Sequence, residues 1–242
     1  MISIIIPTFN EEKLIKSTIE KLTAGLILPH EIIVSDDGST DKTVEILRAM
    51  EQVQVVVNSH ARGEPRTIAR NRNNGAKYAT GDFLVFIDAS CHIDNPRLFF
   101  EQAIENFNTK NILAVTGWVL IDPQLATLAD TIVLGIINRG YLVSNNFLHT
   151  GTATGKFQMF RRDVFLNIGG YNEKLVTCED IDIFKRISKI GRTYFDTRLK
   201  IYHPGRREHT FGWIRLLSIW TVNNIWFILF NRALAKEWSP IR

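Results

Sequence analysis

The sequence predicts an α/β protein with a doubly wound, mostly parallel sheet and a helical extension at its C-terminus. Short runs of apolar and β-branched residues alternate with segments of helical spacing. Several runs end at acidic residues, such as Asp37 and Asp88, and open α/β sheets bind ligands at the carboxyl ends of their strands. The 242 residues suit one large domain or two small ones, and no linker divides the chain.

The first half of the chain contains four predicted strands and three predicted helices. The strands are expected at 2–6, 31–35, 53–57 and 83–87, where apolar runs are bounded by turn residues. The helices are expected from residue 10 to about 22, over 42–50 and over 66–79. Thr40 or Asp41 is the expected cap of the second helix.

The second half continues the alternation less regularly. A helix is expected over 97–107, with Pro96 at its favoured first position. Strands are expected at 112–120 and 156–160, and helices over 124–143, from 161 to the Gly169-Gly170 pair, and over 179–190. We expect residues 1–210 to form the main domain and 211–242 a separate helical segment.

The segment 211–234 has two interpretations. Its centre, 225–230, is very apolar, but Arg215, Asn223 and Asn224 interrupt the stretch before it. A membrane span needs about 20 mainly apolar residues, so we favour a helix lying on a membrane surface or one packed on the main domain or on a partner subunit. The sequence leaves these alternatives open.

Composition narrows the class of protein. The chain is 45% hydrophobic and 22% charged, with a net charge of +4, which suits anionic ligands or an anionic membrane surface without singling out nucleic acid. Cys91 and Cys178 have no metal-site or redox spacing, which indicates a reducing compartment. Residues 1–7 lack the basic start of a signal peptide. We expect a cytoplasmic protein.

The segment 81–90 carries the first candidate site. An apolar strand ends at Asp88, and Ser90 follows two residues later. Oxygen atoms so spaced on an extended segment can face one hard cation, and Mg²⁺ or Mn²⁺ there would hold a diphosphate. Taken alone, the aspartate would be better explained as a strand-ending residue that caps the next helix. His203 is a candidate third metal ligand or diphosphate contact, although a lone histidine is more often structural.

Three further motifs carry candidate chemistry. The turn Asp36-Asp37-Gly38-Ser39 can bind a base edge or ribose hydroxyls, or form an Asx-turn. Arg72 offers a fork of donors to a phosphate or carbonyl group. Glu179 and Asp180 begin a helix, where the dipole favours acids in any protein, but one of them could act as a general base.

In their order along the chain, these motifs resemble a family-2 inverting glycosyltransferase with the GT-A fold. The segments 5–12, 34–41 and 72–88 resemble the family's nucleotide-binding half and its approach to the Asp-x-Asp motif. The segments 155–160, 169–171 and 179–182 resemble its acceptor-side half. The likeness covers about residues 2–205, and the ordered set is specific although each motif alone is not.

The resemblance implies transfer of a sugar from a nucleoside diphosphate-sugar donor to an acceptor hydroxyl, with Asp180 as general base. Residues expected to bind the nucleotide-sugar are Pro7, Thr8, Asn10, Glu12, Asp37, Arg72, Asp88 and Glu179. Asp88, Ser90 and His203 would hold Mg²⁺ or Mn²⁺. Ser90 stands where the Asp-x-Asp motif has its second acid, so this metal would lose one charged ligand.

Other functions compete with this hypothesis. The acceptor could be a glycan or a lipid-linked group, and an ionised polyprenyl phosphate would need no base. Ser90 favours a non-catalytic nucleotide-sugar-binding subunit. A nucleotidyltransferase is disfavoured because residues 5–12 contain neither glycine nor arginine, and a nicotinamide dehydrogenase because no Gly-x-Gly-x-x-Gly follows the first strand. If 211–242 contacts lipid, the protein should lie at the inner face of the membrane.

Overall fold

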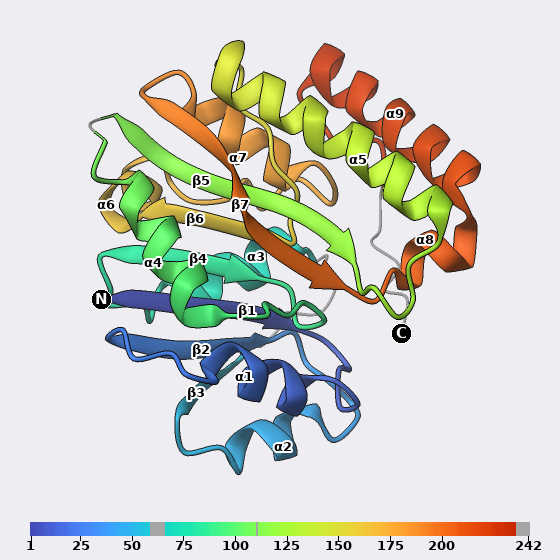
Figure 1. Ribbon diagram of the computed structural model, residues 1–242. Helices are drawn as coiled ribbons and strands as arrows, with labels where there is room; N and C mark the ends of the chain where they lie inside the picture. The colour runs from blue at the N-terminus through green and yellow to red at the C-terminus, as the bar shows by residue number, and fades with distance from the viewer. Residues whose placement is uncertain (59–65, 110, 236–242) are drawn as a thin grey trace.

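The computed structural model describes residues 1–58, 66–109 and 111–235, and its centre is a seven-stranded sheet (Figure 1). The strand order is β3-β2-β1-β4-β6-β5-β7. The strands are β1 (Ile2–Thr8), β2 (His30–Asp36), β3 (Val53–Val57), β4 (Phe83–Ile87), β5 (Ile112–Ile121), β6 (Phe157–Arg161) and β7 (Arg192–His203). Only β6 runs antiparallel to its neighbours in this sheet. The predicted doubly wound, mostly parallel α/β fold is confirmed.

Helices cover both faces of the sheet (Figure 1). They are α1 (Ile15–Thr23), α2 (Thr43–Arg48), α3 (Ile68–Ala76), α4 (Pro96–Asn106), α5 (Leu128–Leu142), α6 (Arg162–Asn167), α7 (Glu179–Ile187), α8 (Arg206–Phe211) and α9 (Trp213–Phe230). A π-helical turn, Val143–Phe147, continues α5. Helices α5 and α9 lie side by side next to the β5–β7 part of the sheet. The boundary expected at residue 210 falls inside α8.

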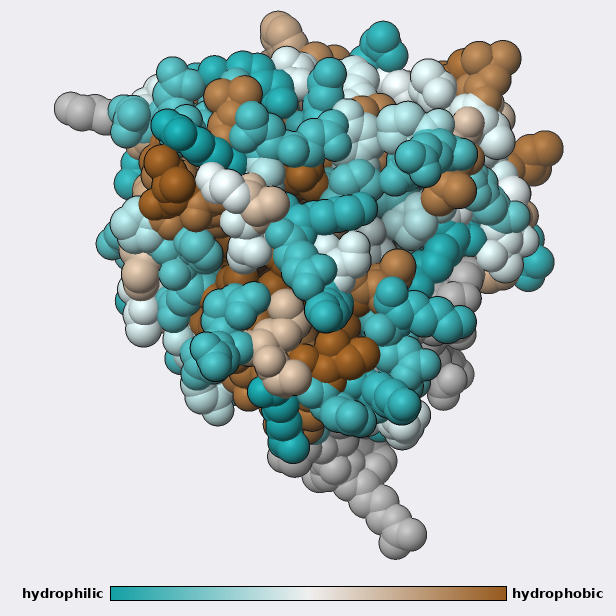
Figure 2. Space-filling view, turned by 60° about the horizontal axis from the view of Figure 1, so that its bottom comes forward, coloured by the Kyte–Doolittle hydropathy of each residue, from teal (hydrophilic) through white to brown (hydrophobic). Residues whose placement is uncertain are grey.

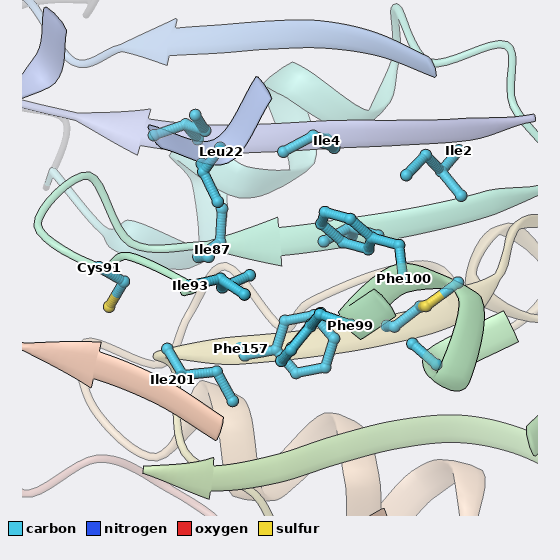
Figure 3. Close-up of a cluster of buried hydrophobic side chains, with 14 of the residues drawn as sticks. Ile2, Ile4, Leu22, Ile87, Cys91, Ile93, Phe99, Phe100, Phe157 and Ile201 are labelled. Atoms are coloured by element: carbon cyan, nitrogen blue, oxygen red, sulfur yellow. The ribbon is translucent and has the colours of Figure 1, made fainter. Parts of the chain in front are cut away.

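The two larger hydrophobic clusters of the described residues lie on opposite faces of the sheet, because strand side chains alternate between the faces. On one face Ile4 and Ile6 of β1 pack with α1, α2 and α4, and on the other Ile5 packs with α3, α6 and α7. Figure 3 shows the first core, where Leu22 of α1 and Phe99 of α4 meet strand residues. Burial on both faces explains why the central strands are continuous apolar runs in the sequence.

The strand β7 was not among the predicted elements. Its inward residues Phe195, Leu199 and Ile201 are buried, but a register shift against β5 interrupts their alternation. The polar residues between them hide the pattern further. One of these, Asp196, is itself buried and accepts hydrogen bonds from Asn106 of α4 and from Arg198.

Helix α1 begins later than expected because residues 10–14 form a turn that is bound to the β2–α2 loop. Asn10 has a left-handed backbone (φ 54°), and its Oδ1 accepts a hydrogen bond from the Thr40 amide at 2.8 Å. Glu12 Oε2 accepts one from the Lys42 amide at 3.0 Å. This loop therefore sits at the carboxyl ends of β1 and β2, beside the cleft described below.

Candidate functional site

A cleft opens at the carboxyl ends of β1, β2, β4 and β7, the edge of the sheet where the predicted site was expected. Six of the predicted site residues line it: Pro7, Thr8, Asp37, Asp88, Ser90 and His203. Four basic side chains line it as well: Arg66, Lys156, Arg206 and Arg207. The cleft is therefore suited to an anionic ligand with hydroxyl groups.

The two aspartates in the turn after β2 have different roles: one stabilises the turn, and the other lines the cleft. Asp36 is fully buried and accepts hydrogen bonds from the amides of Gly38 (3.0 Å) and Ser39 (2.8 Å) and from Thr8 Oγ1 (3.2 Å). Gly38 has a φ of +81°, which favours glycine. Asp36 thus holds the turn, and Asp37 lines the cleft.

Asn10 and Glu12, predicted to line the nucleotide pocket, do not line this cleft. Their side chains are bound to the loop amides described above. They shape the loop that follows β1, and their expected role in binding a nucleotide stays a prediction. Glu11, between them, does line the cleft and forms a two-point ion pair with Arg206, with Nη–Oε distances of 3.0 and 3.2 Å.

Asp88 is held between two cations. Its Oδ1 lies 3.1 Å from Arg72 Nη2, and its Oδ2 lies 3.3 Å from Lys156 Nζ. The side chain of Asp88 is 22% exposed, that of Lys156 28%, and that of Arg72 only 1%. The outer cation, Lys156, therefore faces the cleft, while the inner one is part of the core.

Arg72 joins Asp88, at the end of β4, to Glu179, at the start of α7, through hydrogen bonds. Its Nη1 donates to Glu179 Oε1 at 2.9 Å, and its Nη2 donates to Asp88 and to the carbonyl oxygen of Gly155. Burial alone would lower the pKa of Arg72, but the acidic groups around it, Tyr171, Asp88 and Glu179 among them, raise it. The guanidinium therefore remains charged and binds both carboxylates.

Glu179 and Asp180 begin α7, behind a left-handed Cys178, and neither lines the cleft. Asp180 is half-buried. Burial raises the pKa of both carboxyl groups, and Arg72 opposes that rise. Burial, followed by the charge of Asp180, also raises the pKa of Tyr141 on α5, which indicates that this acid lies near α5. Asp180 follows Glu179 in the chain. Glu179 in turn is connected to Asp88 through ion pairs with Arg72.

The three predicted metal ligands do not form a set that fits a divalent cation. Both carboxylate oxygens of Asp88 are paired with cations, and Ser90 brings no charge. His203 Nδ1 accepts a hydrogen bond from the Gly205 amide at 3.2 Å, which places the ring proton on Nε2. That Nε2 is buried and has no partner among the described residues. Burial, and then Lys156, lower the pKa of His203 to about 2.

Lys156 is a cleft residue that was not predicted from the sequence. Lys156 directly precedes β6, and it reaches this edge only because β6 is antiparallel and begins where β4 ends. No local pattern in the sequence shows that direction. The two arginines after His203 are a signal of positive charge that is visible in the sequence. One of them, Arg206, forms an ion pair with Glu11.

The fold and the cleft define a doubly wound α/β protein with a cleft suited to an anionic ligand at the carboxyl edge of its sheet. The sequence pattern described as "Glycosyl transferase family 2" matches residues 3–169, more than half of the chain. The chain belongs to this family and is a glycosyltransferase, as the sequence analysis expected.

Two named relatives illustrate the likeness. The glucosyl-dolichyl phosphate glucuronosyltransferase of Haloferax volcanii is 24% identical over 237 residues, covering 90% of this chain and 74% of its own. The poly-beta-1,6-N-acetyl-D-glucosamine synthase of Staphylococcus aureus is 25% identical over 189 residues, covering 75% of this chain. The match takes in only 44% of that synthase, so the chain spans less than half its length.

Solved structures confirm the GT-A fold. The mannosyltransferase PcManGT from Pyrobaculum calidifontis, in complex with GDP-Man and Mn²⁺, has a TM-score of 0.67 at 20% identity, covering 84% of this chain and 56% of its own. S. aureus TarS 1–349 in complex with UDP-GlcNAc has a TM-score of 0.60 at 20% identity, covering 83% and 57%. At these identities the likeness establishes the architecture alone.

Proposed function

We propose that this chain is an inverting glycosyltransferase that moves a sugar from a nucleoside diphosphate-sugar to an acceptor hydroxyl. The observation that carries the proposal is the cleft in which Asp37, Asp88 and Lys156 meet at the carboxyl edge of the sheet. The nucleoside would lie against Asp37 and the diphosphate near Lys156. Relatives that bind GDP-Man and UDP-GlcNAc support this class of donor.

Asp180 is the proposed general base. The acceptor oxygen attacks the anomeric carbon, the bond from that carbon to the diphosphate breaks, and the hydroxyl proton passes to Asp180. Burial raises the pKa of this carboxyl group, which increases its affinity for a proton. No covalent enzyme intermediate forms, so the anomeric configuration is inverted.

Donor binding can be measured with UDP, GDP and dTDP in a thermal-shift assay. A nucleoside diphosphate at 100 times its Kd should stabilise the folded chain by about 2.7 kcal/mol. Asp37→Ala should abolish the shift if Asp37 binds the nucleoside, whereas Glu51→Ala, an exposed acid outside the cleft, should not. Absence of a shift with every nucleotide would contradict the donor proposal.

A lipid-linked acceptor is the second candidate, and the surface of α5 and α9 favours it. Among the described residues only α9 is long and apolar enough to cross a membrane by length and composition, with a mean hydropathy of 1.3 and 11% of it buried. Leu128, Ile132 and Ile136, four residues apart on α5, are also exposed. In contrast, hydrophilic residues cover much of the face shown in Figure 2.

The apolar surface of α5 and α9 lies close to the proposed base. Leu216 and Phe227 anchor α9 in the molecule, and the Cys178 thiol donates to Asn224 Oδ1 of α9 at 3.4 Å. Cys178 directly precedes the Glu179–Asp180 pair. We therefore propose that α5 and α9 rest on a membrane and present a lipid-linked acceptor to Asp180. The glucuronosyltransferase named for glucosyl-dolichyl phosphate is a relative of this kind.

Membrane contact can be tested with vesicles containing anionic lipid, which suit the net charge of +4. The chain should co-sediment, and Ile228→Ser combined with Leu229→Ser should weaken binding several-fold because each removes exposed apolar area. Leu98→Ser, which alters an exposed leucine on α4, is the matched control. Failure to bind vesicles, together with self-association through α9, would instead support a protein partner.

The expected domain division and location belong to the same proposal. Residues 1–210 would form the glycosyltransferase domain in the cytoplasm, and 211–242 would hold it at the inner face of the membrane. The free thiols of Cys91 and Cys178, both buried, suit a reducing compartment. Release of labelled sugar product would separate an active transferase from a nucleotide-sugar-binding subunit, which would bind the donor without turnover.

A further inference from the structure

Lys156 lines the cleft, and its ammonium group contacts the carboxylate that was expected to bind metal. The ammonium group lies 3.3 Å from Asp88 Oδ2, and the opposite carboxylate oxygen is bound to Arg72. The side chain of Lys156 is 28% exposed, so its ammonium group is accessible from the cleft.

The charge at this position is balanced without a metal ion. A divalent cation held by two carboxylates forms a neutral unit, and here the two carboxylates of Asp88 and Glu179 are balanced by two side-chain cations. Here Ser90 supplies no second negative charge, and Lys156 supplies one positive charge. A Mn²⁺ ion placed beside Asp88 would be close to both Lys156 and Arg72, which would repel it.

We propose that Lys156 takes the place of the divalent cation and binds the diphosphate of the donor directly, making donor binding independent of metal. This inference rests on the proposed function. When the diphosphate leaves the anomeric carbon, its new negative charge would be stabilised by the ammonium group. Arg206, whose guanidinium lines the same cleft beside Glu11, would contribute a second positive charge.

The test measures binding of UDP, GDP and uridine to the full chain by calorimetry, in a chelator and then in Mn²⁺. The diphosphate that binds should do so in chelator with a Kd within about threefold of that in Mn²⁺. Lys156→Met should weaken its binding at least about tenfold, the value of one charge-assisted contact. Lys156→Arg should retain most of the affinity.

The controls separate a phosphate contact from a structural role. If Lys156 only supports Asp88, its replacement should weaken the nucleoside and its diphosphate equally. A phosphate contact should affect the diphosphate alone. Lys189→Met, at an exposed lysine away from the cleft, should change neither Kd.

Two results would overturn the inference in distinguishable ways. Loss of diphosphate binding in chelator, with recovery in Mn²⁺, would show that a metal is needed and would leave the donor proposal intact. Equal loss of nucleoside and diphosphate affinity in Lys156→Met would assign Lys156 a structural role. If no nucleoside diphosphate bound under either condition, the proposed function itself would fail.

Discussion

Arg72 is the residue on which both halves of the candidate site depend. A charged side chain that is 1% exposed is stable only when its donors are paired, and here Asp88, Glu179 and the Gly155 carbonyl accept from it. Its Nε has no partner among the described residues. Removing either carboxylate would leave the buried charge with a single carboxylate partner.

Gly155→Ala should disturb this arrangement without altering any charged group. A Cβ at position 155 would lie 2.6 Å from Arg72 Nη2, so the guanidinium or the loop must move. We expect a loss of about 1–3 kcal/mol in the free energy of unfolding. Gly140→Ala on α5, where a Cβ meets no atom within 4 Å, should be neutral or stabilising by up to about 1 kcal/mol. Urea unfolding of both variants measures these changes, and an equal change in the free energy of unfolding for the two variants would contradict the prediction.

Asp180→Asn tests the proposed base. With a hydroxyl acceptor, turnover should fall by about two to four orders of magnitude, and the donor Kd should not change. Because burial raises the pKa of Asp180, the wild-type rate should decline as pH falls through that raised value, and the variant should lack this limb. Full turnover with a hydroxyl acceptor would remove Asp180 from the mechanism. Full turnover with a polyprenyl phosphate would support the alternative acceptor.

At the scale of elements, Asp130 joins α5 to α8 and α9. It is the third residue of α5 and accepts from the amide and hydroxyl of Thr127 in a capping box. Its carboxylate also lies 2.9 Å from His209 Nε2 and 2.6 Å from Trp213 Nε1. One buried carboxylate thus fixes the start of the apolar surface formed by α5 and α9.

The junction at Asp130 should be sensitive to acid. Burial would raise the pKa of Asp130, but its hydrogen bonds to His209, Thr127 and Trp213 outweigh this and lower it to about 2. A lowered carboxyl pKa contributes stability above the ordinary value of 3.8, and this is lost as pH falls from 3.8 towards 2. Trp213 fluorescence should report that transition. Asp130→Asn should lack it and unfold about 1–3 kcal/mol more easily; an unchanged transition would contradict this.

The elements also show how much the sequence could predict. The central strand β4 was predicted at its exact bounds, because its residues are buried on both faces and form an unbroken apolar run. The strand β7 was missed because polar residues and a register shift hide its alternation. Lys156 was missed because its position depends on the direction of β6, which follows from strand pairing rather than from local sequence.

For the whole molecule, the raised carboxyl pKa values of Glu179 and Asp180 imply that stability and activity respond to pH in opposite directions. The folded chain retains a proton on this pair at pH values where the unfolded chain has lost it. The contribution of this pair to stability is therefore fully present below the ordinary carboxyl pKa and is lost as pH rises through the raised value. The proposed base, however, must be ionised to act.

Urea unfolding over a pH series should show this decline, and Glu179→Gln should reduce its slope. Gln retains an acceptor for Arg72 but cannot titrate. Stability that increases throughout the neutral range in the wild-type chain would contradict the prediction.

The reversed direction of β6 has one more consequence. The π-helical turn that ends α5 stops at Phe147, and β6 begins at Phe157, so only a short loop joins the apolar surface to Lys156. On the proposals made above, a shift of α5 on contact with lipid should alter the position of Lys156, the proposed phosphate contact. If the chain binds a bilayer as proposed, that contact should therefore change its affinity for the sugar nucleotide.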